Sequence, residues 1–231
     1  MPTKKKKHNM LIISPSSEIA QSFLDNLDTN LNVYSISRRN FFHKSIKKNY
    51  IINSSDNLSN NKLRRYFGSI KFSYFISFIG DQKIEKKSLN EIKNKKILQI
   101  FNTNSIFPVK IVYCLINNNN FKAAAKIIFF SSRSGSITER GTKKHHSKKG
   151  NNIYRASKAL LNSFVKNLAF QNKNTKKIII AYDPGWVMTK SSGGGNISLS
   201  KSTKDLSLII KKIGKKHSGK FLNNKFYEIK W

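Results

Sequence analysis

Short apolar runs alternate with segments of helical periodicity along the chain, and this alternation limits the folds that the chain can adopt. Runs with the length and composition of buried strands lie at 10–13, 33–36, 50–52, 72–79, 126–130 and 177–182. Apolar residues recur at the three- and four-residue spacing of amphipathic helices at 19–27, 63–67, 97–104, 108–115, 154–170 and 206–213. Strands that alternate with helices form a parallel sheet covered by helices. The pattern therefore predicts an α/β fold, with Ser202 as the N-cap of the last helix.

The length and the loop residues of the chain indicate a single domain. Its 231 residues fall within the range of about 200 to 250 in which α/β folds commonly form one domain. Two long loops are predicted, at 135–152 and at 190–200, and loops of such length are often functional. No linker divides the sequence. We therefore predict a basic N-terminal tail at 1–8 and one domain at 9–231.

The charge of the chain is strongly positive, with 44 Lys and Arg against 11 Asp and Glu and a formal net charge of +33. Such a balance fits a nucleic acid or an anionic membrane as partner. It also fits a compositional bias towards residues with A/T-rich codons, because Asn, Ile and Phe are enriched together with Lys. The basic residues run from Lys4 to Lys230, whereas a nucleic-acid footprint should be clustered. We predict no specific nucleic-acid partner.

The sequence gives no indication of a membrane span, a disulfide or a metal site. The apolar stretch 10–13 is shorter than the about 7 to 15 residues of a signal peptide, and no run reaches the about 18 residues of a membrane span. Cys114 is the only cysteine, which excludes an internal disulfide and fits a reducing cytoplasm. His145 and His146 lie in a basic stretch typical of a solvated loop. We therefore expect a cytoplasmic protein without a metal.

Tyr154 and Lys158 form the sharpest local motif, at the start of the long predicted helix. Residues four apart share a helix face, so the phenol and the ammonium can address the same point. A phenol with a pKa of about 10 exchanges protons poorly at neutral pH, and a neighbouring positive charge would lower that pKa. The pair therefore fits a general acid or base, although the same spacing is common on ordinary helix surfaces.

Two further motifs follow strands that flank this helix. Ser132 comes directly after the run 126–130, and the sequence 183–189 comes directly after the run 177–182. Open α/β sheets bind their ligands at the carboxyl ends of the strands. We therefore expect Ser132, Tyr154 and Lys158 to meet at one edge of the sheet.

With these motifs the chain resembles the short-chain dehydrogenases/reductases, and within them the small C-factor-like and sniffer-like carbonyl reductases. Four segments carry the resemblance in order: SSRSG at 131–135, YRASKALLN at 154–162, DPGWVMT at 183–189 and GKFLNNKFYEIKW at 219–231. The resemblance implies a Rossmann-like, doubly wound three-layer sandwich with a mainly parallel sheet of about seven strands. It also implies an NAD(P)(H)-dependent oxidoreductase that acts on a small-molecule carbonyl/alcohol pair, as a possible homodimer or homotetramer.

The resemblance assigns four catalytic residues. Tyr154 would move the hydroxyl proton, and Lys158 would lower the Tyr154 pKa and hold the cofactor ribose. Ser132 would hydrogen-bond the substrate carbonyl, and Asn104 would hold a proton-relay water near Lys158. The segment 190–203 would form a lid over the substrate.

The resemblance also implies a set of cofactor-binding residues. Besides Tyr154 and Lys158, these are Ser14, Ser16, Ser17, Ile19, Arg38, Asn53, Gly80, Pro184, Gly185, Val187 and Thr189. Arg38 follows the second strand, where the family holds the 2′-phosphate of NADP, so NADP(H) is favoured over NAD(H).

The N-terminal half departs from the family pattern. The family's glycine-rich phosphate turn, TGxxxGIG, aligns with residues 13–20, which contain no glycine, and Glu18 adds a negative charge where two phosphates would bind. A carboxylate also suits the first turn of an ordinary helix that binds no nucleotide. A cofactor-impaired protein with a binding or regulatory role is therefore the alternative to an active enzyme.

Overall fold

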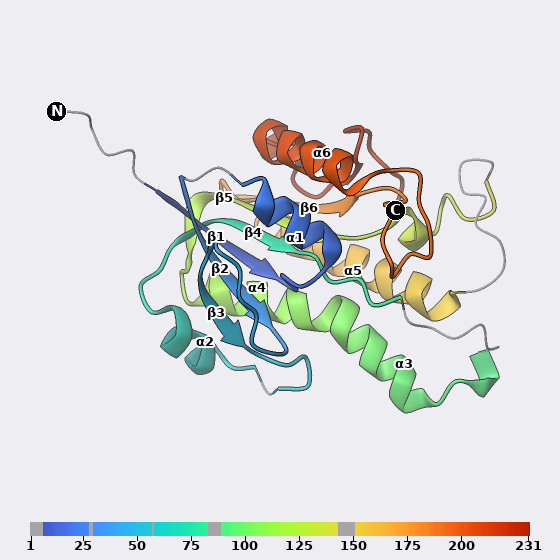
Figure 1. Ribbon diagram of the computed structural model, residues 1–231, viewed down its shortest axis with the longest axis horizontal. Helices are drawn as coiled ribbons and strands as arrows, with labels where there is room; N and C mark the ends of the chain where they lie inside the picture. The colour runs from blue at the N-terminus through green and yellow to red at the C-terminus, as the bar shows by residue number, and fades with distance from the viewer. Residues whose placement is uncertain (1–6, 28–29, 57, 83–88, 143–150) are drawn as a thin grey trace.

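The chain forms one parallel seven-stranded sheet (Figure 1), and the computed structural model describes residues 7–27, 30–56, 58–82, 89–142 and 151–231. The strand order is β3-β2-β1-β4-β5-β6-β7, and every neighbouring pair is parallel. The strands are β1 (His8–Ile13), β2 (Leu31–Ser37), β3 (Ile46–Ile51), β4 (Phe72–Ser77), β5 (Phe121–Phe130), β6 (Ile178–Asp183) and β7 (Phe221–Asn223). The order reverses between β1 and β4, which is the topology of a doubly wound sheet. The predicted fold class is confirmed.

The helices cover both faces of the sheet. They are α1 (Glu18–Asp25), α2 (Asn60–Phe67), α3 (Asn94–Phe101), α4 (Phe107–Asn117), α5 (Asn152–Gln171) and α6 (Leu199–Lys212). Short turns of 3-10 helix lie at η1 (Leu89–Glu91), η3 (Arg133–Gly135) and η4 (Lys215–His217), and a π-helical turn, η2 (Asn102–Ile106), joins α3 to α4. Figure 1 shows α1 and α6 on one face, with α2, α4 and α5 on the other.

Two apolar cores follow from the two-residue period of the strands. In β1, Leu11 and Ile13 point into the core shared with α2, α4 and α5, whereas Met10 and Ile12 point into the core shared with α1 and α6. All four side chains are at most 2% exposed. A strand buried on both faces reads as a continuous apolar run, which explains why the short apolar runs predicted the central strands.

The structure corrects several predicted boundaries. Helix α6 begins at Leu199 with Ser198 as its N-cap, because the Ser198 Oγ accepts the Lys201 N–H at 3.2 Å; the predicted cap, Ser202, is buried inside the helix. Strand β5 begins at Phe121, earlier than the run 126–130, because the small residues between do not mark a strand by their hydropathy.

Two sequence predictions involve residues outside the described ranges, and a third, the predicted lid, needs a correction within them. The tail predicted at 1–8 is wrong at its end, because His8 already pairs with Leu31 in the sheet; residues 1–6 lie outside the described residues. His145 and His146 also lie outside them. Part of the lid predicted at 190–203 is helix, since residues 199–203 belong to α6.

Candidate active site

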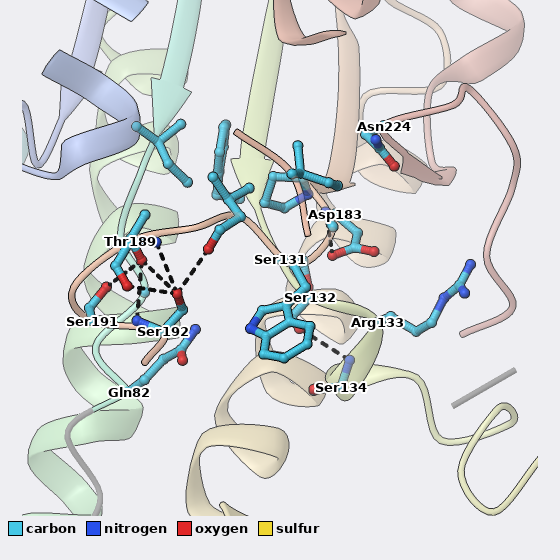
Figure 2. Close-up of a pocket in the computed structure, with 18 of the residues that line it drawn as sticks. Gln82, Ser131, Ser132, Arg133, Ser134, Asp183, Thr189, Ser191, Ser192 and Asn224 are labelled. Atoms are coloured by element: carbon cyan, nitrogen blue, oxygen red, sulfur yellow. Dashed lines mark hydrogen bonds between the residues drawn. The ribbon is translucent and has the colours of Figure 1, made fainter. Parts of the chain in front are cut away.

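A cavity of about 1440 Å³ opens at the carboxyl edge of the sheet. Its walls come from the segments that follow β1, β4, β5 and β6, and from the first turns of α1 and α5. Ser132, Tyr154 and Lys158 all line it, as predicted from their positions after β5 and at the start of α5. Figure 2 shows Ser131, Ser132 and Asp183 together at the ends of β5 and β6.

The close packing of η3 against α5 sets the position of Ser132. Gly135 ends η3, and a Cβ atom added there would lie 2.7 Å from the Lys158 carbonyl carbon. Only a glycine permits this approach, so the SSRSG sequence brings the turn into contact with the helix that carries Tyr154 and Lys158. The Ser132 Oγ caps the turn by accepting the Ser134 N–H at 3.2 Å.

Tyr154 presents a buried phenol to the cavity. Its side chain is 6% exposed, its hydroxyl accepts a hydrogen bond from Gln82 Nε2 at 3.2 Å, and the Ser132 side chain lies close to the same hydroxyl. Burial raises the pKa of Tyr154 to about 12, although the contacts with Ser132 and Gln82 act in the opposite direction. The expected lowering of this pKa is therefore wrong, because desolvation outweighs the stabilising contacts.

Lys158 is buried beside the Tyr154 ring. Its side chain is 1% exposed, and its Nζ lies 5.8 Å from the centre of that ring. The ammonium donates to the carbonyl oxygens of Ile79 at 2.8 Å and Phe130 at 2.7 Å, at the ends of β4 and β5. Burial lowers the pKa of Lys158 to about 7. Lys158 is therefore close to losing its charge at neutral pH, which limits how strongly it can favour a phenolate.

Asn104 lies in the π-helical turn η2 and fixes the segment after β4. Its side-chain Oδ1 accepts the Asp81 N–H at 2.9 Å, and its Nδ2 donates to the Asp81 carbonyl oxygen and to Ser157 Oγ, each at 3.0 Å. The turn has a sequence cause: Pro108 has no N–H to give to the carbonyl four residues earlier, and the Phe107 N–H bonds to Asn102 instead. The relay-water role of Asn104 stays a prediction.

Asp183 joins the two loops that carry the site. Its buried carboxylate accepts the Gly185 N–H at 3.2 Å and the backbone N–H of Arg133. Burial raises the pKa of Asp183 above its usual range, although both hydrogen bonds act to lower it. The carboxylate therefore fixes the turn after β6 relative to the turn that carries Ser132.

The turn after β1 keeps a left-handed residue without a glycine. Ser14 has φ 62°, in the region that favours glycine, and its carbonyl oxygen accepts the Ser17 N–H at 3.2 Å. Ser17 caps α1 by accepting the Ala20 N–H at 3.2 Å. The backbone thus makes the turn between β1 and α1, and the local strain falls on Ser14.

The cavity collects most of the predicted cofactor-binding residues, and four lie outside its lining. Inside are Ser17, Ile19, Gly80, Tyr154, Lys158, Pro184, Gly185, Val187 and Thr189; outside are Ser14, Ser16, Arg38 and Asn53. Arg38 is exposed after β2, and the Asn53 N–H bonds to Asp56 Oδ2 at 3.2 Å. The cavity thus holds the predicted cofactor-binding residues near Tyr154, whereas Arg38 lies outside it on the surface.

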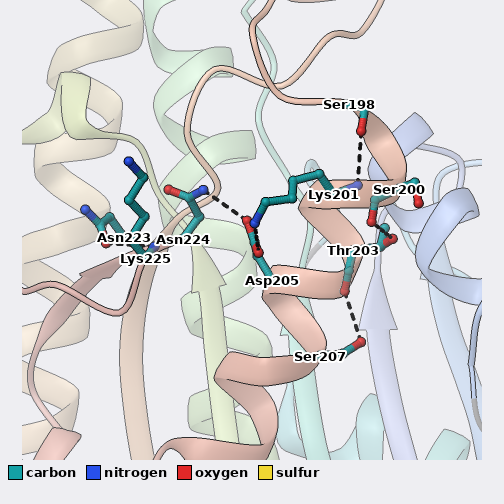
Figure 3. Close-up of polar contacts among 9 residues, drawn as sticks. All are labelled: Ser198, Ser200, Lys201, Thr203, Asp205, Ser207, Asn223, Asn224 and Lys225. Atoms are coloured by element: carbon teal, nitrogen blue, oxygen red, sulfur yellow. Dashed lines mark hydrogen bonds and ion pairs between the residues drawn. The ribbon is translucent and has the colours of Figure 1, made fainter.

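The remaining wall comes from the β6–α6 segment (residues 184–198) and from the residues after β7. Ser192 Oγ lies 2.8 Å from the Val187 carbonyl oxygen and 3.0 Å from Thr189 Oγ1, within the group labelled in Figure 2. Asp205 on α6 pairs with Lys201 and accepts from Asn224 Nδ2 at 3.1 Å (Figure 3). These contacts tie α6 to the segment after β7 at the mouth of the cavity.

Sequence reasoning missed three residues with a clear place in the site. Gln82 bonds the Tyr154 hydroxyl, Asp183 joins two loops, and Trp186 lines the cavity while 60% exposed. Asp183 and Trp186 belong to the motif at 183–189, and the position of this motif after the predicted strand 177–182 could have indicated their place in the site. Gln82 had no such signal, because only the fold brings it to Tyr154.

Two kinds of feature were sought among the described residues: a cluster of metal ligands and a helix that could cross a membrane. No group of three or more His, Cys, Asp or Glu is placed to hold a metal ion there. None of the helices described is both long and apolar enough to cross a bilayer.

The sequence of the chain is similar to that of a protein of known identity. No model of a protein family matches the chain. The C-signal protein of Myxococcus xanthus is 22% identical over 145 residues, which make up 62% of this chain and 84% of that protein.

Solved structures match nearly the whole chain. Carbonyl reductase Sniffer of D. melanogaster has a TM-score of 0.83 at 20% identity, covering 97% of this chain and 100% of its own. A putative short-chain dehydrogenase/reductase from Burkholderia multivorans with bound NADP has a TM-score of 0.81 at 16% identity, with coverage of 97% and 100%. An NADPH-bound carbonyl reductase from chicken fatty liver has a TM-score of 0.79 at 18% identity, with coverage of 98% and 100%. The chain therefore has the fold of the short-chain dehydrogenases/reductases, the family that its motifs resemble.

Proposed function

We propose that this chain is an NADP(H)-dependent short-chain oxidoreductase that interconverts a small-molecule carbonyl compound and its alcohol. One observation carries the proposal: Tyr154, Ser132 and Lys158 meet in one cavity at the carboxyl edge of the sheet, with the Ser132 side chain near enough to act on the pKa of the Tyr154 hydroxyl. A proton donor and a second hydrogen-bonding hydroxyl side by side fit a carbonyl oxygen that gains a proton.

Each residue has a distinct task in this proposal. The Tyr154 hydroxyl gives its proton to the substrate oxygen, and Ser132 Oγ hydrogen-bonds the same oxygen. Lys158 lies behind Tyr154, held by the Ile79 and Phe130 carbonyl oxygens, and offers positive charge to the phenolate that proton transfer leaves. A bound nicotinamide would supply the hydride.

The residues present fit the nicotinamide half of such a cofactor. Gly80 lies against Lys158, since a Cβ atom added at Gly80 would be 3.8 Å from Nζ, and a buried ammonium of this kind suits a ribose hydroxyl. Pro184, Gly185, Val187 and Thr189 form the facing wall. The proposal of NADP(H) over NAD(H) is further supported by the two structurally similar proteins described as holding NADP or NADPH, and by Arg38 after β2.

We infer the remaining properties from the sequence. The single sheet supports one domain, which begins one residue before the predicted range of 9–231, and the lone Cys114 supports a cytoplasmic location. Assembly as a homodimer or homotetramer stays a prediction, to be checked by light scattering.

The test of the proposal is NADPH-dependent reduction of a panel of aldehydes and ketones by the wild-type protein and by Tyr154→Phe. The variant should lower turnover at least about 10²-fold, because it removes the proton donor, while its NADPH affinity stays unchanged. Tyr113→Phe is the matched control, since Tyr113 bonds Gln171 on the outer side of α4 and α5. Full activity in Tyr154→Phe would refute the assigned mechanism.

A further inference from the structure

Glu18 makes a contact that its position in the family pattern does not explain. Its Oε1 accepts the backbone N–H of Lys190 at 2.9 Å, a bond between residues 172 positions apart. Glu18 is in the first turn of α1, and Lys190 belongs to the β6–α6 segment. The carboxylate therefore joins two segments that line the cavity, since Ser17 and Ile19 come from the start of α1 and Thr189 comes from the β6–α6 segment.

The β6–α6 segment also has hydrogen bonds of its own, in addition to the bond to Glu18. The Met188 N–H bonds to the Ile197 carbonyl oxygen at 2.8 Å, and Thr189 forms a bridge with Gly194. Ser198 then caps α6, as described above. These bonds fold the segment back on itself, and the Glu18 bond attaches it to α1 at Lys190.

The charge at this place matters for a dinucleotide. The first turn of α1 carries the positive end of the helix dipole, which favours an anion. In a doubly wound sheet this is where a cofactor diphosphate binds. Glu18 puts a carboxylate there, and two like charges at close range near a protein surface repel strongly.

We propose that Glu18 sets the dinucleotide affinity of this chain: its carboxylate occupies the anion position at the start of α1, holds the β6–α6 segment through the Lys190 N–H, and competes with the cofactor diphosphate. This inference rests on the proposed function. In the glycine-free turn after β1, the Glu18 carboxylate would then be the cause of a reduced dinucleotide affinity. The backbone of the turn would not be the cause, since Ser14 still adopts the left-handed conformation.

The experiment compares NADPH affinity in wild type, Glu18→Gln, Glu18→Ala and Asp25→Asn by fluorescence titration. Gln keeps an acceptor for the Lys190 N–H and removes the charge, whereas Ala removes both. Asp25→Asn is the matched control, because it removes one negative charge from the last residue of the same helix. We expect Glu18→Gln and Glu18→Ala to bind about tenfold more tightly than wild type, and Asp25→Asn to bind like wild type. The gain should shrink between ionic strengths of about 0.01 M and about 1 M, as the Debye length falls from about 30 Å to about 3 Å.

A second measurement follows the contact without cofactor. Hydrogen exchange at the Lys190 amide should be at least about tenfold faster in Glu18→Ala than in wild type, and unchanged in Asp25→Asn. Equal exchange in Glu18→Ala and wild type would show that the contact is absent and overturn the inference. If all four proteins bind NADPH equally, the proposed function stands and the role of Glu18 is overturned; if none binds, the proposed function itself is wrong.

Discussion

Lys158 is the most deeply buried charged group in the site, and the proposed function needs its positive charge beside the Tyr154 phenolate. Its ammonium has two carbonyl partners and no carboxylate among the contacts described, so desolvation dominates its pKa. The spacing of Tyr154 and Lys158 was enough to predict that they share a helix face. It could not predict how deeply both are buried, because burial depends on β4, β5 and η3 closing around the start of α5. The direction of the Tyr154 pKa was therefore predicted wrongly.

The buried lysine predicts a specific pH dependence of stability. Burial lowers the pKa of Lys158 from 10.5 to about 7, so the unfolded chain binds more protons than the folded chain between those values. The contribution of Lys158 to stability is therefore most unfavourable at pH 7 and below, and it improves as the pH rises towards 10. Replacing Lys158 by Met removes this dependence. The stability of Lys158→Met relative to wild type should be highest near pH 7 and decline by a few kcal/mol by pH 10.

Urea denaturation at several pH values measures this difference, and other titrating groups cancel between the two proteins. Lys176→Met, at an exposed position beyond the end of α5, serves as control and should keep a constant difference from wild type. Parallel pH curves for Lys158→Met and wild type would contradict the buried-lysine account.

At the scale of elements, the site depends on how closely η3 approaches α5. The sequence predicted the strand that leads into η3 and the helix α5, through the run 126–130 and the helical period of 154–170. It did not predict η3 itself, and the close approach of η3 to α5 depends on Gly135. Other boundaries were harder to predict: Ser202 was an acceptable cap by residue type, but the Ser198 Oγ accepts the Lys201 N–H and caps α6. The π-helical turn before Pro108 has no signature in hydropathy, since it preserves the apolar spacing on both sides.

Gly135→Ala tests this approach directly. The added methyl would meet the Lys158 carbonyl carbon at 2.7 Å and the Ala159 nitrogen at 3.0 Å, so η3 or α5 must shift. We expect a loss of about 1–3 kcal/mol in the free energy of unfolding, together with a fall in turnover as Ser132 moves relative to Tyr154. Gly214→Ala is the control, because its Cβ atom would meet nothing within 4 Å and its φ is −134°. Equal stability of the two variants would show that the approach is not tight.

At the scale of the whole molecule, the sheet order and the net charge act on the same site. The order brings the ends of β1, β4, β5 and β6 to one edge, and the alternation of strands and helices was sufficient to predict that meeting. The turn after β1, where the cofactor diphosphate is predicted to bind, was harder to predict. The family's glycines are missing there, and residue type alone cannot show that Ser14 still adopts the left-handed conformation. The net charge of +33 gives the molecule a positive field that attracts anions, and this field acts against the local charge of Glu18.

The proposed function depends on the binding of NADP(H) at the carboxyl edge of the sheet despite the glycine-free turn. Titration of the purified protein with NADPH and with NADH, followed by cofactor fluorescence, tests it most directly. We expect NADPH to bind saturably and more tightly than NADH, and the fluorescence signal to be lost when NADP competes. Failure of both cofactors to bind at millimolar concentration would contradict it.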